Sequence, residues 1–268
     1  MEQWVEGQRF EDGALAPVRE ALAVEAILQI RINGTPYTTT VRTPGADEAL
    51  ARGLLFSEEV LTDLDVPCRF ESILDPETGI IGAMDVRVAP ERLARAIDDR
   101  RTMAATASCG LCGVRDAADL KLYGGPLRVT GEEAFSLRRV EGMVQAMKSC
   151  QRTFESTGGC HAAAAFTIEG EMLAVHEDIG RHNAVDKVIG ELITAGSLDR
   201  ARCLAVSGRM SYEIVFKAFH ARLPFLLSVS APSSLAVEMG EQFGLTIIGF
   251  CRDNRATVYS QTGRVTST

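Results

Sequence analysis

The chain has 268 residues, of which 46% are hydrophobic, so it can bury the core of one large domain or two small ones. Its formal net charge is −8, and no run of basic residues offsets that charge, which argues against DNA, RNA or acidic lipid as a partner. A small anionic ligand remains open, because a few well-placed arginines act locally. The sequence opens without a basic and apolar leader and contains no long apolar run, so we expect a cytoplasmic protein without a membrane partner.

The cysteines indicate a reducing compartment. There are seven, an odd number, and they are scattered through a chain that is large enough to need no disulfide framework. Several are expected to be small buried hydrophobes, among them Cys203 within the apolar run Cys-Leu-Ala-Val.

The first half of the chain predicts a small α+β part. Segments 21–32 and 35–42 are rich in β-forming residues and flank an Asn-Gly pair, the strongest short hairpin signal. After Thr-Pro-Gly, leucines recur at helical spacing from residue 50 onward, which predicts a helix. A further strand pair is expected within 69–89, with Gly79 at its turn.

The second half predicts an α/β domain. Helical spacing returns over 135–150, and a hairpin is expected from segments 162–169 and 172–176. Beyond it, strands and helices alternate, in the order helix 181–195, strand 202–206, helix 212–222, strand 225–229, helix 233–242 and strand 245–250. Such alternation indicates βαβ crossovers and a mixed, mostly parallel sheet covered on both faces. We expect two parts, residues 1–130 and residues 131–268.

Between about residues 98 and 117 the periodicity fails around the motif CGLCG, which predicts a mobile loop. Structural zinc would need four ligands, but Cys109 and Cys112 form a lone CxxC pair, so we expect no metal. A redox dithiol is a second interpretation, although the flanking glycines favour a flexible loop over the helix start of a thioredoxin-type motif. A third is a sulfur shuttle, which needs an exposed thiolate on a segment that reaches two partners.

Three segments of the second half follow predicted strands, namely 207–209, 230–234 and 249–255. The carboxyl ends of parallel strands share one edge of a sheet, so these loops should converge. Their helix-start amides, hydroxyl groups and arginines suit the pyrophosphate of an anionic nucleotide. The alternative for Arg252 and Arg255 is a plain surface turn.

The run HEDIGRHN leads from a predicted strand into a helix, where His182 and Asp186 share one face. Polar residues this dense at a helix start indicate either a ligand site or a capping network. His176 and His182 are six apart, which excludes HExxH zinc chemistry. Upstream, the glycines before His161 suit a tight turn or a close approach to a ligand, and the H-x-E motif of zinc deaminases is missing there.

Six strings carry a family resemblance in this order: CGLCG, TGGCHAAA, HEDIGRHNAVDK, SGRMSYE, SAPSSLAVE and GFCRDNRATVY. Together they resemble the formate dehydrogenase accessory sulfurtransferase family (FdhD), over roughly residues 20–260. Cys160 departs from the family pattern, and Cys251 and Asn254 stand at its variable positions. We expect no sulfur-carrying role for either of these cysteines.

The resemblance implies a homodimer whose larger domain has a cytidine-deaminase-like α/β fold without the deaminase zinc. It also implies that a cysteine desulfurase supplies sulfur, which travels as a persulfide to the molybdenum bis(molybdopterin guanine dinucleotide) cofactor of formate dehydrogenase. By motif position Cys109 is the carrier and Cys112 its helper. GDP is the expected surrogate for the nucleotide end of the cofactor. The candidate cofactor-binding residues are His182, Ser207, Arg209, Phe250, Cys251, Arg252, Asp253, Asn254 and Arg255.

Two rivals to a sulfurtransferase remain open. A chaperone could bind the molybdenum cofactor and use CGLCG only for docking, in which case replacing both cysteines would leave its function intact. A thiol oxidoreductase would instead show a titratable Cys109–Cys112 disulfide in its working cycle.

Overall fold

The computed structural model describes residues 1–93, 125–128 and 134–267; the predicted mobile loop with Cys109 and Cys112 lies outside these residues. The predicted first hairpin is confirmed as β3 (Ala26–Ile32) and β4 (Thr35–Arg42). Asn33 and Gly34 both have positive φ, as a two-residue turn of this kind requires.

The first sheet has the strand order β4-β3-β6-β5 and includes the predicted strand pair β5 (Arg69–Leu74) and β6 (Ile81–Arg87). The expected helix is α1 (Asp47–Ser57). Alternate residues of β3 pack with the leucines of α1 in one apolar core, which includes Leu28, Ile30, Leu50 and Leu55. The alternating apolar residues of the strand and the helically spaced leucines of α1 are thus buried against each other at one interface.

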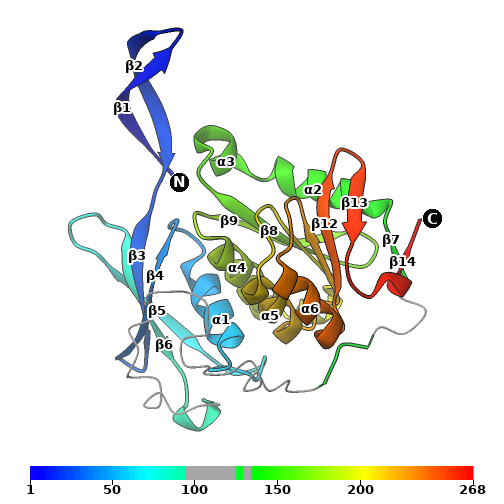
Figure 1. The fold of residues 1–268 in the computed structure, drawn as a ribbon. Helices are drawn as coiled ribbons and strands as arrows, with labels where there is room; N and C mark the ends of the chain where they lie inside the picture. Colours follow the sequence, from blue (N-terminus) through cyan, green and yellow to red (C-terminus); the bar gives the residue numbers. More distant parts are fainter. Residues whose placement is uncertain (94–124, 129–133, 268) are drawn as a thin grey trace.

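The residues before the first sheet form a ribbon that extends from the body and that the sequence did not predict. Strands β1 (Glu2–Glu11) and β2 (Ala14–Ala23) form a separate two-stranded antiparallel ribbon, whose tip projects away from the rest of the molecule (Figure 1). Its residues mix apolar and polar types without the buried alternation that identifies a strand of a core sheet.

The second sheet has the order β13-β12-β11-β10-β8-β9. The expected strands are β8 (His161–Phe166), β9 (Met172–Asp178), β10 (Cys203–Val206), β11 (Phe225–Ser228) and β12 (Thr246–Arg252). Strand β13 (Arg255–Val258) was not predicted.

The expectation of a mostly parallel sheet is wrong. Among the described strand pairs of the second sheet, only β10–β11 and β11–β12 are parallel, whereas β8–β9, β8–β10 and β12–β13 are antiparallel. The reason lies in the connections: helical crossovers impose parallel pairing, but the sheet begins and ends with short hairpins, which can join only antiparallel strands.

Helices cover both faces of this sheet, as expected. The helices are α2 (Arg139–Ser149), α3 (Arg152–Thr157), α4 (Arg181–Thr194), α5 (Tyr212–His220) and α6 (Ser234–Phe243). One face carries α2, whose Val140 and Met143 pack with Phe166 and Phe225. The other carries α4, α5 and α6 (Figure 1), with Val188 and Ile214 in their shared core. The short strands β7 (Phe135–Ser136) and β14 (Val265–Thr266) pair beside α2.

Helices α1 and α4 join the two sheets and cross at two glycines. A Cβ on Gly53 would lie 1.9 Å from the carbonyl oxygen of Asp186, and one on Gly190 would lie 1.9 Å from that of Ala49. The helix backbones therefore touch, as small residues permit. The expected boundary at residue 130 falls among residues 129–133, outside the described part of the chain.

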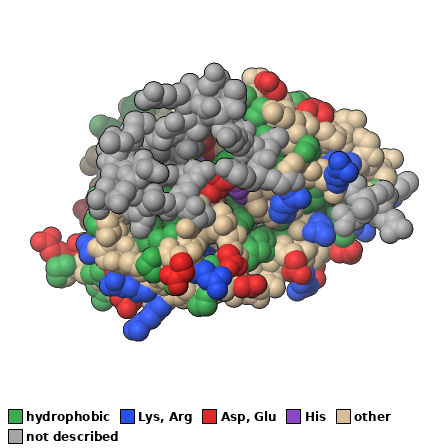
Figure 2. Space-filling view, turned by 90° about the horizontal axis from the view of Figure 1, so that it is seen from below, with side chains coloured by type: hydrophobic (Ala, Val, Ile, Leu, Met, Phe, Trp, Pro, Cys, Tyr) green, Lys and Arg blue, Asp and Glu red, His purple; other side chains and the backbone are tan. Residues whose placement is uncertain are grey.

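The described surface seen from below mixes basic and acidic side chains with apolar ones, and no large patch of one sign gathers there (Figure 2). No helix in the described ranges is both long and apolar enough to cross a membrane.

Candidate functional site

The three loops predicted to converge do so at one edge of the second sheet. The Met210 amide donates to the carbonyl of Ala231 at 3.1 Å, and the Ser233 amide donates to the carbonyl of Met210 at 2.9 Å. The Phe250 amide in turn donates to the carbonyl of Ser230 at 3.0 Å. These hydrogen bonds fix the ends of β10, β11 and β12 relative to one another and form the ligand-binding edge typical of an α/β sheet.

The start of β8 reaches the same edge, because β8 runs antiparallel to β10. The amide of Ala162 donates to Ser207 Oγ at 2.9 Å, and the Ser207 amide donates to the Ala162 carbonyl at 2.9 Å. Ser207, a predicted binding residue, thus holds His161 and its preceding glycines beside the strand ends. His161 was not among the predicted binding residues, since pairing with β10 depends on tertiary structure.

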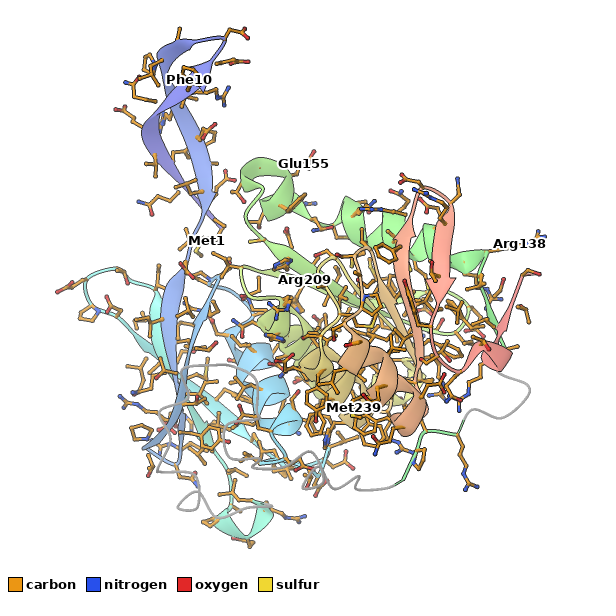
Figure 3. The ribbon with its side chains drawn as sticks, viewed as in Figure 1. Met1, Phe10, Arg138, Glu155, Arg209 and Met239 are labelled. Carbon is orange, nitrogen blue, oxygen red and sulfur yellow. The ribbon has the colours of Figure 1, made fainter. Side chains whose placement is uncertain are left out.

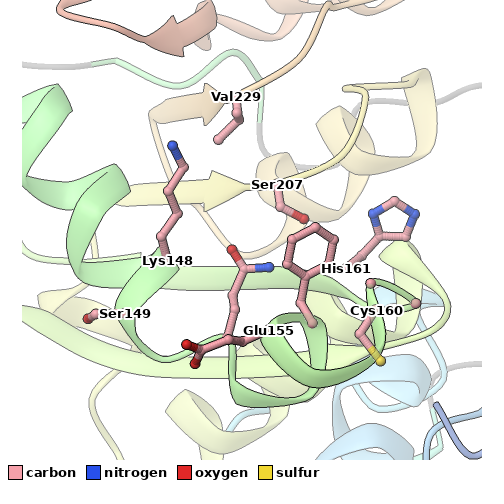
Figure 4. Close-up of a pocket in the computed structure, with 11 residues that line it drawn as sticks. Lys148, Ser149, Glu155, Cys160, His161, Ser207 and Val229 are labelled. Carbon is pink, nitrogen blue, oxygen red and sulfur yellow. The ribbon is translucent and has the colours of Figure 1, made fainter. Parts of the chain in front are cut away.

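A cavity of about 760 Å³ opens at this edge (Figure 4). Its walls come from the end of α2, from α3, from the start of β8 and from the ends of β10 and β11. They comprise Lys148, Ser149, Gln151, Phe154, Glu155, Gly158, Gly159, Cys160, His161, Ser207 and Val229. Its size is typical of small-molecule sites. The thiol of Cys160 faces the Thr43 hydroxyl at 3.6 Å, and burial raises its pKa. A raised pKa disfavours the thiolate form of Cys160.

Two arginines and two histidines gather beside the cavity. A Cβ on Gly208 would lie 3.1 Å from His161 Nδ1 and 3.7 Å from Arg181 Cβ, so the loop after β10 passes closely over both residues. Arg209, next along this loop, is exposed at the same edge (Figure 3). Arg181 Nε is buried and has no hydrogen-bond partner among the described residues. This group is therefore short of acceptors, which an anionic ligand would supply.

Both histidines of this group are held neutral. Burial, then Arg181 and Arg209, lower the pKa of His161. Burial, together with the positive charges of Arg181 and Lys217, lowers the pKa of His182 to about 4. The carboxylate of Glu213 acts in the opposite direction. His182 Nε2 lies 3.5 Å from Ser211 Oγ and 3.8 Å from a Glu213 carboxylate oxygen. At neutral pH the arginines supply the positive charge, and the imidazoles supply hydrogen-bonding groups.

Most of the HEDIGRHN run forms the capping and packing network that the sequence left as an alternative to a ligand site. The Glu177 carboxylate accepts hydrogen bonds from two amides at the start of α3, those of Thr153 and Phe154. Asp178 pairs with the buried Lys187 at 2.7 Å and accepts the amide of Thr43 at 3.2 Å. Within the run, Arg181 and His182 lie at the site, whereas Asn183 donates to the Val41 carbonyl and belongs to the packing network.

Asp186 shares the His182 face of α4, as predicted, but has a structural role. Its carboxylate accepts hydrogen bonds from Lys217 Nζ at 2.7 Å and Ser57 Oγ at 2.8 Å, so it links α4 to α5 and α1. His176, on β9, pairs with Glu191, which lies on α4.

The predicted cofactor-binding loop is a hairpin rather than an open strand-end loop. Strand β12 continues to Arg252 through an irregular register, and Asp253 and Asn254 turn the chain with φ of 54° each. Asn and Asp tolerate this conformation, so two residues are enough to join β12 to β13. The side chains of Phe250, Arg252, Asp253, Asn254 and Arg255 are exposed on this hairpin at the site edge.

Cys251 differs from its neighbours on the hairpin. Its side chain is fully buried with the α2 core, its thiol donates to the Ile248 carbonyl, and burial raises its pKa to about 11. Its thiol therefore faces the core and not the surface of the hairpin, and a cofactor-binding role for Cys251 stays a prediction. Cys203 is buried as expected. No cluster of potential metal ligands occurs in the ranges that the structure covers.

The fold is that of a mixed α/β protein. At the strand ends of its second sheet, Arg181 and Arg209 favour an anionic ligand. The chain belongs to the FdhD/NarQ family, whose family model matches residues 23–266, and the resemblance found in the sequence is thereby confirmed. It is 41% identical to a protein named "Sulfur carrier protein FdhD" from Streptomyces avermitilis, over 96% of this chain and 93% of that one. It is 40% identical to a protein of the same name from Mycobacterium tuberculosis, over 92% of each.

A solved structure shares the fold. The crystal structure of a formate dehydrogenase accessory protein from Desulfotalea psychrophila aligns with a TM-score of 0.77, covers 99% of both chains and has 18% sequence identity. The expectation of a cytidine-deaminase-like domain stays a prediction.

Proposed function

We propose that this protein is a sulfur carrier in formate dehydrogenase maturation, which takes sulfur as a persulfide on Cys109 and transfers it to the molybdenum bis(molybdopterin guanine dinucleotide) cofactor. The proposal is supported by relatives named sulfur carriers. The observation that carries its cofactor half is the group at the sheet edge: Arg181, whose Nε has no partner among the residues the structure describes, Arg209, and two neutral histidines beside a cavity. Such groups suit a pyrophosphate.

Loading is a thiol exchange that needs no external oxidant. The Cys109 thiolate attacks the outer sulfur of a persulfide on a cysteine desulfurase; a new S–S bond forms on Cys109 as the S–S bond of the donor breaks, and the donor cysteine leaves as a thiolate. Cys112 is the proposed helper. Both residues lie outside the described part of the chain, so the assignment comes from the motif CGLCG.

Sulfur loading tests the carrier assignment. Intact-protein mass spectrometry after incubation with a cysteine desulfurase and cysteine should show a gain of one or more sulfur atoms, which a reductant removes. Cys109→Ser should lose this gain, because the thiolate is the acceptor. Cys150→Ser is the matched control, since Cys150 is a partly exposed thiol elsewhere in the molecule, and it should load normally.

Two results would contradict the carrier assignment. Normal loading of Cys109→Ser would place the persulfide on another cysteine. Full support of formate dehydrogenase activity by a variant lacking both Cys109 and Cys112 would instead favour the cofactor-binding chaperone.

Nucleotide binding tests the cofactor half. GDP should bind the wild-type protein in calorimetry and raise its melting temperature by mass action. Charge-assisted contacts contribute about 1.5–3 kcal/mol, so Arg209→Ala, and separately Arg252→Ala with Arg255→Ala, should weaken GDP binding roughly ten- to a hundredfold. Arg200→Ala is the control, because this exposed arginine pairs with Glu171 before β10 begins, at the opposite end of that strand.

The outcomes separate the parts of the proposed site. Equal GDP binding by the Arg252 and Arg255 double variant would move the pyrophosphate to the start of α4, where Arg181 and His182 lie. Absence of GDP binding to the wild type would contradict the cofactor half while leaving sulfur loading to be judged by its own experiment.

A further inference from the structure

One wall of the cavity at the sheet edge, the α3 wall, consists of Gln151, Phe154 and Glu155. Their spacing places the three side chains on one face at the start of α3. The Glu155 amide donates to the Gln151 carbonyl at 2.9 Å, so these two residues are one helical turn apart. The carboxylate of Glu177 accepts the amides of Thr153 and Phe154 and thereby fixes this turn. The fold therefore holds the α3 wall in a defined position.

Gln151 brings an unused carboxamide to the α3 wall. The residue is only 7% exposed, yet its side chain neither caps α3 nor makes another hydrogen bond with the described residues. Buried polar groups normally have partners, and a buried amide without one is costly. Because Gln151 lines the cavity, a bound ligand is the natural source of the missing donor and acceptor.

The other two residues of the α3 wall add an aromatic surface and a negative charge. Phe154 is 48% exposed although it lines the cavity, so part of its ring lacks apolar cover. Glu155 is also exposed, and its carboxylate offers only acceptors. The cation of the cavity lies elsewhere, because the Lys148 side chain extends toward Val229, just beyond the end of β11 (Figure 4).

His161 connects the cavity to the arginines of the sheet edge. It lines the cavity and also lies against the loop after β10, next to Arg181. One ligand can therefore place a ring against the α3 wall and a phosphate beside Arg181. Such a ring should be flat, so that it stacks on Phe154, and should carry adjacent N–H groups, which suit a carboxylate.

We propose that the α3 wall binds the 2-amino-4-oxopyrimidine ring that guanine and pterin share. Phe154 stacks on the face of this ring, Glu155 accepts from its ring N–H and its 2-amino group, and Gln151 bonds its oxo side. Adenine is disfavoured, because the carboxylate would face a ring nitrogen that is itself an acceptor. The proposal rests on the proposed function, whose cofactor contains both rings.

Two nucleotides that differ in one group test the role of Glu155. IDP lacks the 2-amino group of GDP, so with guanine in the cavity the wild type should bind IDP roughly tenfold more weakly in calorimetry. Glu155→Ala should bind the two equally, whereas a merely structural defect would weaken both alike. Glu169→Ala is the matched control and should keep the preference, because this exposed carboxylate lies between β8 and β9, at the far end of β8 from His161.

Neopterin, a free pterin, distinguishes the two sources of the ring. Phe154→Ala should weaken the probe that occupies the cavity roughly tenfold, and Gln151→Leu should weaken the same probe. Loss confined to GDP places guanine there. Loss confined to neopterin places the pterin there, and Glu155→Ala should then weaken neopterin and leave the ratio of GDP to IDP binding unchanged. Phe10→Ala is the control, since this 70% exposed ring lies in the ribbon, and it should affect neither probe.

Two results would overturn the ring assignment. The first is binding of GDP and neopterin that neither Phe154→Ala nor Glu155→Ala weakens. If Arg209→Ala still weakens GDP binding in that case, the proposed function stands and only the α3 wall is wrong. The second is a wild type that binds neither probe, and sulfur loading on Cys109 then judges the carrier role by itself.

Discussion

At the residue scale, the neutrality of His182 depends on its surroundings. The side chain is 11% exposed, and three cationic or cationisable neighbours, Arg181, Lys217 and His161, oppose its protonation, with Glu213 as the opposing acid. The folded-state pKa of about 4 is below the ordinary 6.5, so the unfolded chain binds the extra proton first as the pH falls. Neutral His182 therefore contributes stability above pH 6.5, and this stability is lost toward pH 4.

Urea unfolding at two pH values measures this effect. Between pH 7 and pH 5, His182 should cost the wild type roughly 2 kcal/mol of unfolding free energy. His182→Gln cannot titrate, so its loss over the same interval should be smaller by about that amount. Equal pH dependence of the two proteins would show that another residue governs the acid sensitivity, and His161, whose pKa is also lowered, would be the first to test.

At the element scale, the α1–α4 crossing depends on the absence of side chains. Alanine normally favours a helix over glycine by about 1 kcal/mol. At Gly53, however, an added methyl group would collide with the backbone carbonyl of Asp186 on α4. A backbone carbonyl cannot move aside as the end of a flexible side chain can. We therefore expect steric exclusion to outweigh helix propensity at this position.

Thermal and urea unfolding of two alanine variants checks this expectation. Gly53→Ala should lose stability by several kcal/mol, because the helices must separate to admit the methyl group. Gly142→Ala in α2 is the matched control: an added Cβ there meets nothing within 4 Å, so the variant should gain about 0.5–1 kcal/mol. A Gly53→Ala variant as stable as the wild type would show that α1 shifts readily on α4.

At the scale of the whole molecule, buried polar contacts join the first sheet to the second. Lys187 Nζ donates to the Thr43 carbonyl at 2.8 Å and pairs with Asp178, while Asn183 Nδ2 donates to the Val41 carbonyl at 2.8 Å. With the α1–α4 contact, this network connects the end of β4 directly to α4. We expect the two parts to unfold together.

Asp178→Asn tests this coupling. The change leaves the buried Lys187 ammonium without its counterion, which should cost about 3–5 kcal/mol. Circular dichroism in the far and near ultraviolet should report a single transition in both proteins, at a lower denaturant concentration in the variant. An exposed pair provides the control: Arg200→Gln removes the partner of Glu171 and should change stability by less than about 1 kcal/mol. Two separate transitions in the wild type would contradict the coupling.

Local chemistry determined much of this protein from the sequence alone. The Asn33-Gly34 turn, the helical leucines and the alternation of strands with helices predicted elements that the structure confirms. The convergence of the loops after β10, β11 and β12 also followed, because the carboxyl ends of parallel strands share an edge. Family membership followed from six ordered motifs.

Tertiary structure alone decided the rest. Nothing in the sequence near Asp178, Glu177 or Asp186 indicates that Thr43, Thr153 and Ser57 are among their partners, because these three residues come from other elements. Thr43 and Ser57 lie more than a hundred residues away in sequence from the carboxylates that they contact. The antiparallel entry of β8, which brings His161 to the site, depends on sheet pairing that a periodic pattern does not specify. The β1–β2 ribbon escaped prediction for a related reason: a strand is recognised by the face it buries, and this ribbon buries almost none within its own chain.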